Sequence, residues 1–190
     1  MKIVFRVDAS VQMGTGHVMR CMTLANGLQQ HGADLLFICR EHPGNLIDMI
    51  EGNGYPVVRL QQAETQYVAV PGDVTHAAWL GVSWQQDAAG TIAAIGGTPA
   101  DWLIIDHYAL DRFFEQAVRP YVRKIMVIDD LADRPHDCDM LLDQNLGRTA
   151  DDYAHLVPRK SKVLLGAQHS LLRPEFATLR SYSLKRRQSV

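Results

Sequence analysis

The stretch Ile3-Val4-Phe5-Arg6-Val7-Asp8-Ala9-Ser10-Val11-Gln12-Met13-Gly14-Thr15-Gly16-His17 decides the fold of this chain. Its first five residues form an apolar run that only Arg6 interrupts, which is typical of a buried strand. Gly14 and Gly16 then allow the backbone to turn sharply. From His17 onward, apolar residues recur at helical spacing as far as Gln30, and a glycine two residues later is a typical stop signal. The stretch therefore predicts a strand, a glycine-containing loop and a helix.

The same alternation of short apolar runs and helical stretches continues along the chain. We predict further strands at 35–39, 56–60, 102–105, 125–128, 140–142 and 163–165, and further helices at 45–51, 84–95 and 111–121. Strands that are apolar without alternation are buried on both faces of a sheet. The sequence therefore predicts an α/β fold, with a Rossmann-like parallel sheet and helices on both faces. Residues 61–82 and 181–190 give no clear periodic pattern.

The composition is that of an ordinary globular protein. Of the 190 residues, 47% are hydrophobic and 21% are charged, with a formal net charge of -2. This charge creates no strong field toward nucleic acid or acidic membranes, so we expect neither as a partner. The three cysteines show no C-x-x-C spacing, which argues against a disulfide framework or a structural zinc site. Without a signal-peptide pattern or an apolar run of about 18 residues, a cytoplasmic location is expected.

Three polar clusters directly follow predicted strands. Asp8–His17 follows the first strand, Asp106-His107-Tyr108 follows the strand at 102–105, and Asp129-Asp130 follows the strand at 125–128. In open parallel sheets, ligands bind beyond the carboxyl ends of the strands. We therefore predict a single ligand site where these clusters meet.

His17 is the candidate catalytic base of this site. It falls in the first turn of a predicted helix, after a loop that lets the backbone approach a ligand. Histidine side chains ordinarily titrate near about pH 6.5, which leaves a neutral fraction that accepts protons at cellular pH. A histidine that only caps the helix, or is merely exposed, would explain the same position.

A dinucleotide site is the main competing interpretation of Gly14 and Gly16. The third glycine position of G-x-G-x-x-G holds Met19, however, and Arg40-Glu41 does not provide a cleanly placed ribose-binding acid. The phosphate-binding pattern G-x-x-x-x-G-K-[ST] is also absent. Asp129-Asp130 lacks a third clustered ligand for magnesium. We therefore expect neither a cofactor nor a metal.

Several of these polar residues also have purely structural explanations. Asp106 and His107 fit a strand-to-helix turn before a helix cap at Asp111. Asp129-Asp130 fits a solvated or capping pair, and Asp143-Gln144-Asn145 fits a turn. The residues alone leave these alternatives open.

Ordered motifs spread over nearly the whole chain carry a family resemblance. They are Phe5-Arg6-Val7-Asp8-Ala9-Ser10, Gly14-Thr15-Gly16-His17-Val18-Met19-Arg20, Asp106-His107-Tyr108, 128–134, 136–145, Leu164-Leu165-Gly166 and 171–176. At these motifs the sequence resembles the UDP-sugar hydrolases of pseudaminic acid biosynthesis. The resemblance implies hydrolysis of UDP-2,4-diacetamido-2,4,6-trideoxy-β-L-altropyranose to UDP and the free sugar, with inversion and without a metal.

The resemblance also assigns roles to particular residues. His17 stands where the family has its catalytic base, and Tyr108 matches an active-site tyrosine. The loop around Gly14 and Gly16 is similar to one in the cell-wall glycosyltransferase that makes lipid II. Contacts with the UDP-sugar substrate are then expected from Asp8, Ser10, Gly14, Gly16, Arg20, Asp106, Tyr108 and Asn145.

The family's architecture is glycosyltransferase-B-like, with two Rossmann-like domains that face each other across a cleft. We therefore expect residues 1–175 to form the amino-terminal domain that carries the catalytic base, and residues 176–190 to begin an interdomain linker. The carboxy-terminal domain, which supplies most contacts with UDP in the family, is then absent from this chain. A disordered basic tail would explain the composition of the last residues equally well.

Two other functions remain open on the sequence. A glycosyltransferase would share the fold and would use His17 to deprotonate a sugar hydroxyl, so only dependence on an acceptor separates it from a hydrolase. A non-catalytic sugar-nucleotide-binding domain would be indifferent to the substitution His17→Ala.

We predict that this 190-residue chain folds but binds UDP weakly, because the diphosphate would lack the contacts of the second domain. Calorimetric titration of the chain with UDP tests this expectation. Saturable binding in the micromolar range would contradict it.

Overall fold

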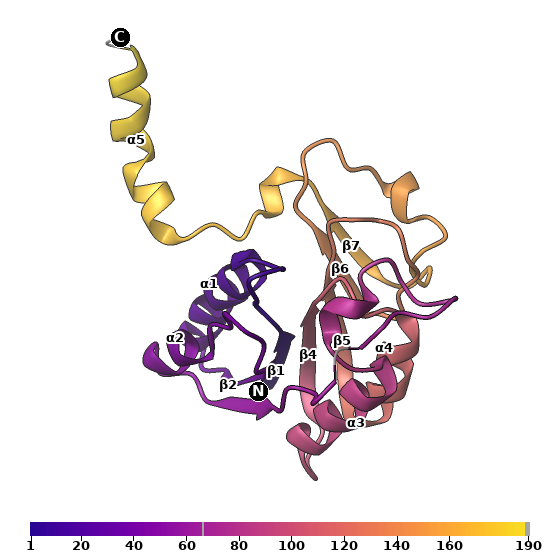
Figure 1. Ribbon diagram of the computed structural model, residues 1–190. Helices are drawn as coiled ribbons and strands as arrows, with labels where there is room; N and C mark the ends of the chain where they lie inside the picture. The colour runs from indigo at the N-terminus through magenta and orange to yellow at the C-terminus, as the bar shows by residue number, and fades with distance from the viewer. Residues whose placement is uncertain (66, 189–190) are drawn as a thin grey trace.

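The computed structural model describes residues 1–65 and 67–188 of the chain. Within them, seven parallel strands form one sheet in the order β3-β2-β1-β4-β5-β6-β7 (Figure 1). The strands are β1 Lys2–Val7, β2 Asp34–Arg40, β3 Val57–Leu60, β4 Ala100–Asp106, β5 Val122–Ile128, β6 Met140–Asp143 and β7 Lys162–Leu165. The strand order reverses between β1 and β4, and this is the point where doubly wound sheets bind their ligands.

Helices cover both faces of this sheet. Helices α1 Gly16–Gln30 and α2 Ile47–Gly52 lie over one face, and α3 Trp84–Ile95 and α4 Arg112–Val118 lie over the other (Figure 1). Short 3-10 helices form η1 Ala77–Leu80, η2 Arg119–Tyr121, η3 Ala150–Tyr153 and η4 Ala167–His169. The predicted α/β class, with helices on both faces of a parallel sheet, is confirmed.

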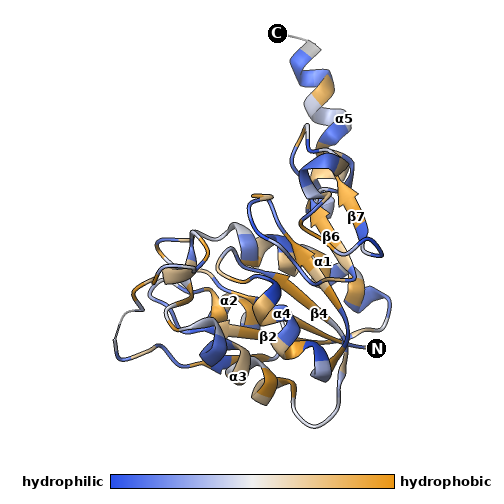
Figure 2. Ribbon diagram, turned by 90° about the vertical axis from the view of Figure 1, so that its right-hand side faces the viewer, coloured by the Kyte–Doolittle hydropathy of each residue, from blue (hydrophilic) through white to orange (hydrophobic). Residues whose placement is uncertain are grey.

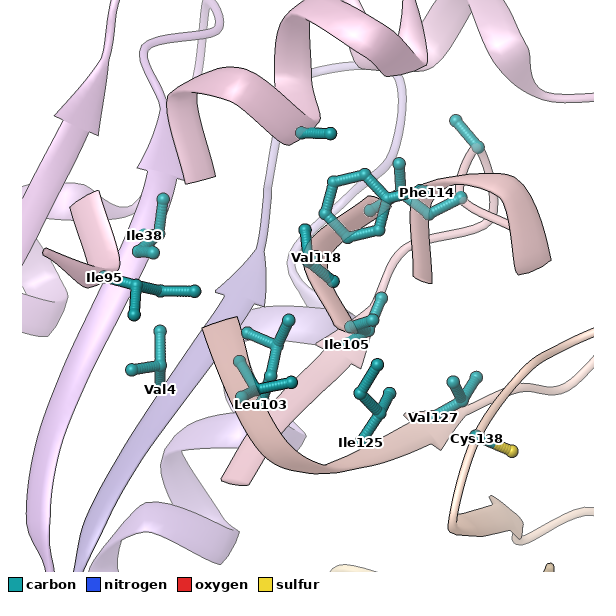
Figure 3. Close-up of a cluster of buried hydrophobic side chains, with 14 of the residues drawn as sticks. Val4, Ile38, Ile95, Leu103, Ile105, Phe114, Val118, Ile125, Val127 and Cys138 are labelled. Atoms are coloured by element: carbon teal, nitrogen blue, oxygen red, sulfur yellow. The ribbon is translucent and has the colours of Figure 1, made fainter. Parts of the chain in front are cut away.

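Each face of the sheet has its own hydrophobic core, because successive residues of a strand point to opposite faces. In β1, Val4 packs into the core beneath α3 and α4, whereas Ile3 and Phe5 pack into the core beneath α1 and α2. Figure 3 shows the first of these cores, where Phe114 of α4 lies near Ile105 of β4. Burial on both faces explains why the strands are continuously apolar in the sequence.

Arg6 is the polar exception in β1, and its side chain is fully buried. Its guanidinium donates to Asp87 of α3 at 2.8 and 2.7 Å and to Asp8 at 2.6 and 2.9 Å. Arg40, at the end of β2, donates to Asp87 at 2.5 Å and offers its backbone N–H to Asp8 at 2.7 Å. Two arginines and two aspartates thus form a buried network of opposite charges, which ties β1 and β2 to α3.

The two aspartates of this network are held in their charged form. Burial alone would raise the pKa of Asp8 and of Asp87, but the charge of Arg6 and the hydrogen bonds to each carboxylate together outweigh burial and hold both pKa values below their ordinary range. Buried charges are stable in a protein only when they are paired and hydrogen-bonded, as these are.

The helix predicted at 84–95 coincides with α3, and the strands predicted at 102–105 and 125–128 lie within β4 and β5. Residues 61–82, which show no periodic pattern, contain the short helix η1 in the structure.

The structure also shows a helix that we did not predict. Helix α5 spans Pro174–Gln188 and covers most of the stretch 176–190; residues 189–190 lie outside the described part of the chain. That this stretch begins an interdomain linker stays a prediction. Helix α5 extends away from the sheet (Figure 1) and is mostly hydrophilic (Figure 2). Because its described side chains are exposed, it needs no apolar stripe, and the periodicity that identifies a packed helix is missing.

We predict that Asp87→Ala lowers the free energy of unfolding by about 3–5 kcal/mol, because Arg6 and Arg40 would keep buried charges without this carboxylate. Urea denaturation followed by circular dichroism measures the change. The matched control is Asp48→Ala, which removes a carboxylate that is 91% exposed and pairs with Arg59. The control should lose less than about 1 kcal/mol. Equal losses in the two variants would contradict the prediction.

Candidate active site

The connection from β1 to α1 is a compact turn. The backbone N–H of Gly14 donates to the carbonyl of Ser10 at 2.8 Å. The Ser10 hydroxyl oxygen accepts the backbone N–H groups of Gln12 at 3.2 Å and Met13 at 3.0 Å. These bonds fold the loop against itself, and α1 then begins immediately, so that His17 falls in its first turn.

The two glycines of this turn are not equivalent. Gly14 has a φ of 76°, a left-handed conformation that strains residues with a side chain. Gly16 is not in that conformation, and a Cβ there would meet no atom within 4 Å. The backbone therefore requires glycine at position 14. Close approach of a ligand to Gly16 stays a prediction.

His17 is paired with a carboxylate from the neighbouring strand. Its Nδ1 lies 2.6 Å from Oδ1 of Asp106, the last residue of β4. The two meet because β4 lies beside β1, and β1 leads into the helix that carries His17. The other ring nitrogen, Nε2, has no hydrogen-bond partner among the residues that the structure describes.

Asp106 is fully buried and charged. Burial alone would raise the pKa of Asp106, but hydrogen bonds from Arg20 and the neighbouring His17 outweigh it and lower the pKa. Arg20 donates to both carboxylate oxygens at 2.6 Å. A charged carboxylate only accepts hydrogen bonds, so Nδ1 of His17 carries a hydrogen. In the neutral ring the lone pair is therefore on Nε2, which is the atom able to take a proton.

Arg20 extends this pair to a second carboxylate and to Tyr108. Its Nη1 donates to Asp130 at 2.5 Å, and the Tyr108 hydroxyl donates to the same oxygen at 2.8 Å. Burial and the hydrogen bond to Asp130 raise the pKa of Tyr108, so this hydroxyl stays protonated and acts as a donor. The Tyr108 ring also packs edge-on against the ring of His17, with centroids 4.5 Å apart. The His17 ring is thereby held from two sides.

Two aromatic residues that the sequence analysis missed continue this arrangement. His76 lies 5.7 Å from the ring centroid of Tyr108, and Trp79 of η1 lies 6.1 Å from it. The rings of His76 and Trp79 are 4.4 Å apart. Both residues belong to the segment without periodicity, so no pattern assigned them to the site. The signal in the sequence that could have found them is the short spacing of His76 and Trp79, three positions apart in a segment without periodicity.

A pocket of about 370 Å³ begins beside these rings. Its wall includes Trp79 of η1, Ser10 and Gln12 of the β1–α1 loop, and His42 after β2. It therefore lies at the carboxyl ends of β1 and β2, next to the point where the strand order reverses. Of the three polar clusters expected at the ligand site, only the one after β1 lines this pocket, so the predicted position of the ligand stays a prediction.

The predicted site residues differ in how deeply they are buried. Asp8 and Asp106 are 0% exposed, and their carboxylates are held by Arg6 and by His17 with Arg20, respectively. Both carboxylates lie beneath the surface of the site, where they hold neighbouring side chains in place by hydrogen bonds. The residues with accessible surface near the site are Ser10, Gly14, Gly16, Arg20 and Tyr108.

Asn145 is exposed and donates to the backbone carbonyl of Asp130 at 3.0 Å. His107 is buried, and its Nδ1 accepts the backbone N–H of Ala109 at 3.0 Å. This bond places the remaining hydrogen of the neutral His107 ring on Nε2, which lies 3.3 Å from Asp8. His107 therefore supports the turn after β4, as its structural interpretation predicts. A contact between Asn145 and a ligand stays a prediction.

The described residues provide no group of three or more metal-binding side chains. Asp129, which we considered as a metal ligand or an orienting group, accepts hydrogen bonds from Arg134 and Tyr153, each at 2.9 Å. Its partners show that it holds the loop after β5. Within the same residues, no helix is long and apolar enough to cross a membrane.

Comparisons with known proteins agree with this picture. No family model matches the chain. The chain is 34% identical, over 177 residues, to the UDP-2,4-diacetamido-2,4,6-trideoxy-beta-L-altropyranose hydrolase of Campylobacter jejuni; the match covers 93% of this chain and 53% of the relative. The predicted resemblance is confirmed. An uncharacterised protein of Methanocaldococcus jannaschii is 22% identical over 188 residues, a match that covers 98% of this chain and 34% of that protein.

Among solved structures, the fold is similar to that of MurG from Acinetobacter baumannii, with a TM-score of 0.52 and 10% sequence identity. The match covers 85% of this chain and 44% of MurG. At this identity the likeness concerns the fold alone, and it confirms the predicted glycosyltransferase-B-like, Rossmann-like class. The chain spans about half the length of the Campylobacter relative and a smaller share of the archaeal one.

We predict that neutral His17 carries its hydrogen on Nδ1, because charged Asp106 only accepts a hydrogen bond. Long-range ¹H–¹⁵N correlation spectra of the imidazole rings identify this tautomer. In Asp106→Ala the preference for Nδ1–H should disappear, whereas the exposed His155 should keep its spectrum in both proteins. A His17 ring with its hydrogen on Nε2 in the unsubstituted protein would contradict the assignment.

Proposed function

We propose that this chain supplies the catalytic base of a UDP-sugar hydrolase, and that the base is His17. The observation that carries the proposal is the 2.6 Å contact between Nδ1 of His17 and the charged, buried Asp106, with Nε2 left without a protein partner. The similarity to the Campylobacter hydrolase supports the reaction class. The aromatic residues and the pocket beside the base provide room for a ligand.

In the proposed reaction, Nε2 of His17 accepts a proton from a water molecule as the water oxygen attacks the anomeric carbon of the sugar. The bond between that carbon and the phosphate oxygen breaks, and UDP departs with the electron pair. The imidazolium formed at His17 is stabilised by the negative charge of Asp106. General-base catalysis of this kind contributes about 10²- to 10⁴-fold in rate.

Arg20, Asp130 and Tyr108 position the base in this proposal. Arg20 balances the charge of Asp106, so that the carboxylate remains an acceptor toward His17 and not a competing base. The edge-on contact of Tyr108 fixes the plane of the His17 ring. A ring held in this way needs no reorganisation before it accepts a proton, which favours the transition state.

We further propose that the complete site uses a second domain to bind UDP. The first support is coverage, because this chain matches only 53% of the Campylobacter hydrolase and 44% of MurG. The second support is the pocket next to Trp79, whose described wall has no lysine or arginine to hold a diphosphate. The substrate proposed is UDP-2,4-diacetamido-2,4,6-trideoxy-β-L-altropyranose, the compound that the relative's name specifies.

The test is release of UDP from this substrate by the chain joined to its proposed second domain. We predict that His17→Ala lowers kcat by about 10²- to 10⁴-fold, because the water loses its base. Asp106→Asn should lower kcat with little change in KM, because it removes the charge that fixes His17 without removing a ligand contact.

His155→Ala is the matched control, because His155 is an exposed histidine away from the site residues. It should release UDP at the unsubstituted rate. Undiminished release by folded His17→Ala would refute the assignment of the base. No release by the folded two-domain protein, together with sugar transfer once an acceptor is added, would favour a glycosyltransferase.

A further inference from the structure

We propose that the pocket beside Trp79 is a subsite for the acylamino sugar ring of the substrate, with Nδ1 of His42 as a hydrogen-bond acceptor toward it. The proposal rests on the proposed function and goes beyond it, because it assigns one part of the ligand to one pocket. The pocket measures about 370 Å³, which falls within the range of small-molecule sites, about 300–1,000 Å³.

The position of the pocket fits the sugar end of a nucleotide sugar. Trp79 forms part of its wall and lies 6.1 Å from Tyr108, whose ring lies 4.5 Å from that of His17. A water activated by His17 attacks the anomeric carbon, so the sugar ring must lie within one or two side chains of the base. Along this path one side chain, Tyr108, separates the wall of the pocket at Trp79 from His17.

The charges of the wall favour a sugar over a diphosphate. The described lining residues include one carboxylate, Glu64, and neither lysine nor arginine. A diphosphate would meet repulsion from Glu64 without a balancing cation. A neutral sugar with hydroxyl and amide groups instead finds donors and acceptors in Ser10 and Gln12, and a flat aromatic surface in Trp79.

His42 gives the pocket a second histidine–aspartate pair, separate from that of His17. The side chain of His42 is 9% exposed, and its Nε2 lies 3.4 Å from Oδ2 of Asp8. Nε2 faces charged Asp8 without forming a hydrogen bond at this distance, and the negative charge favours the neutral ring that has its hydrogen on Nε2 and its lone pair on Nδ1. Nδ1 has no hydrogen-bond partner within residues 1–65 and 67–188.

Gly81 keeps the space beside this nitrogen open. A Cβ at Gly81 would lie 3.0 Å from Cε1 and 3.6 Å from Nδ1 of His42, so a side chain there would press on the ring. Gly81 also lines the pocket. The lone pair of Nδ1 can therefore accept a hydrogen bond from an amide N–H or a hydroxyl group, and acylamino sugars offer both.

Binding of the free sugar to the 190-residue chain tests this inference without any catalytic step. The probe is 2,4-diacetamido-2,4,6-trideoxy-L-altrose, titrated while NMR follows the Trp79 indole and the His42 imidazole. We expect saturable shifts of both signals. Gly81→Ala and Trp79→Ala should each weaken binding by about tenfold or more. The first places a methyl group against the His42 ring and so blocks the contact with Nδ1, and the second removes the aromatic surface.

Gly96→Ala is the matched control for Gly81→Ala. Both glycines have a φ of 77°, but ψ is -12° at Gly81 and -169° at Gly96, a region that essentially only glycine adopts. Gly96→Ala therefore strains the backbone at least as much, although a Cβ there meets no atom within 4 Å. Gly96→Ala should bind the sugar as the unsubstituted chain does. Circular dichroism confirms the fold of each variant, and Trp79→Ala carries the test if Gly81→Ala fails to fold.

Three results would overturn the subsite. They are sugar titrations that shift neither Trp79 nor His42, unchanged affinity in both pocket variants, and shifts of His42 by UDP but not by the sugar. The proposed hydrolysis would survive these results, because it depends on His17. Conversely, full activity of His17→Ala would refute the base and leave a sugar-binding pocket in place.

Discussion

The buried guanidinium of Arg6 is the interaction on which the geometry of the candidate site depends. It joins Asp8, at the end of β1, to Asp87 of α3, and Asp87 in turn accepts from Arg40 at the end of β2. These contacts hold together the strand ends from which the β1–α1 loop and the 40–43 segment emerge. A hydrophobic residue at position 6 would fill the same volume, but it could not fix two loops by directional hydrogen bonds.

Both histidine–aspartate pairs follow from this frame. Asp106 lies at the end of β4 and orients His17, whereas Asp8 lies at the end of β1 and faces His42 and His107. Because β1 and β4 are neighbours, the two carboxylates end up at the same edge of the sheet. Each carboxylate is charged and buried, with an arginine beside it. The same arrangement of a buried, charged carboxylate beside an arginine thus faces both His17, the proposed proton acceptor, and His42, the proposed hydrogen-bond acceptor.

Local patterns in the sequence predicted much of the fold and the centre of the site. The apolar runs predicted the central strands because those strands are buried on both faces, and polar residues after the runs marked the edge of the sheet where the candidate site lies. The segment 61–82 could not be read because η1 is a single short turn, with no repeating face to detect. Trp79, which it contains, was missed for that reason. Helix α5 was missed because the side chains described in it are exposed, so that no apolar stripe is required.

The sequence by itself determined the α/β class, the loop that places His17 at the start of a helix, and the resemblance to a sugar-nucleotide hydrolase. These features depend on residues close together in the chain, or on motifs that can be compared directly. Only the tertiary structure decided which polar side chain meets which. Arg6 and Asp87 are 81 residues apart, and His17 and Asp106 are 89 apart, so no local pattern could pair them. Their pairing arises because the order of strands in the sheet differs from their order in the chain, which brings distant strand ends to one edge.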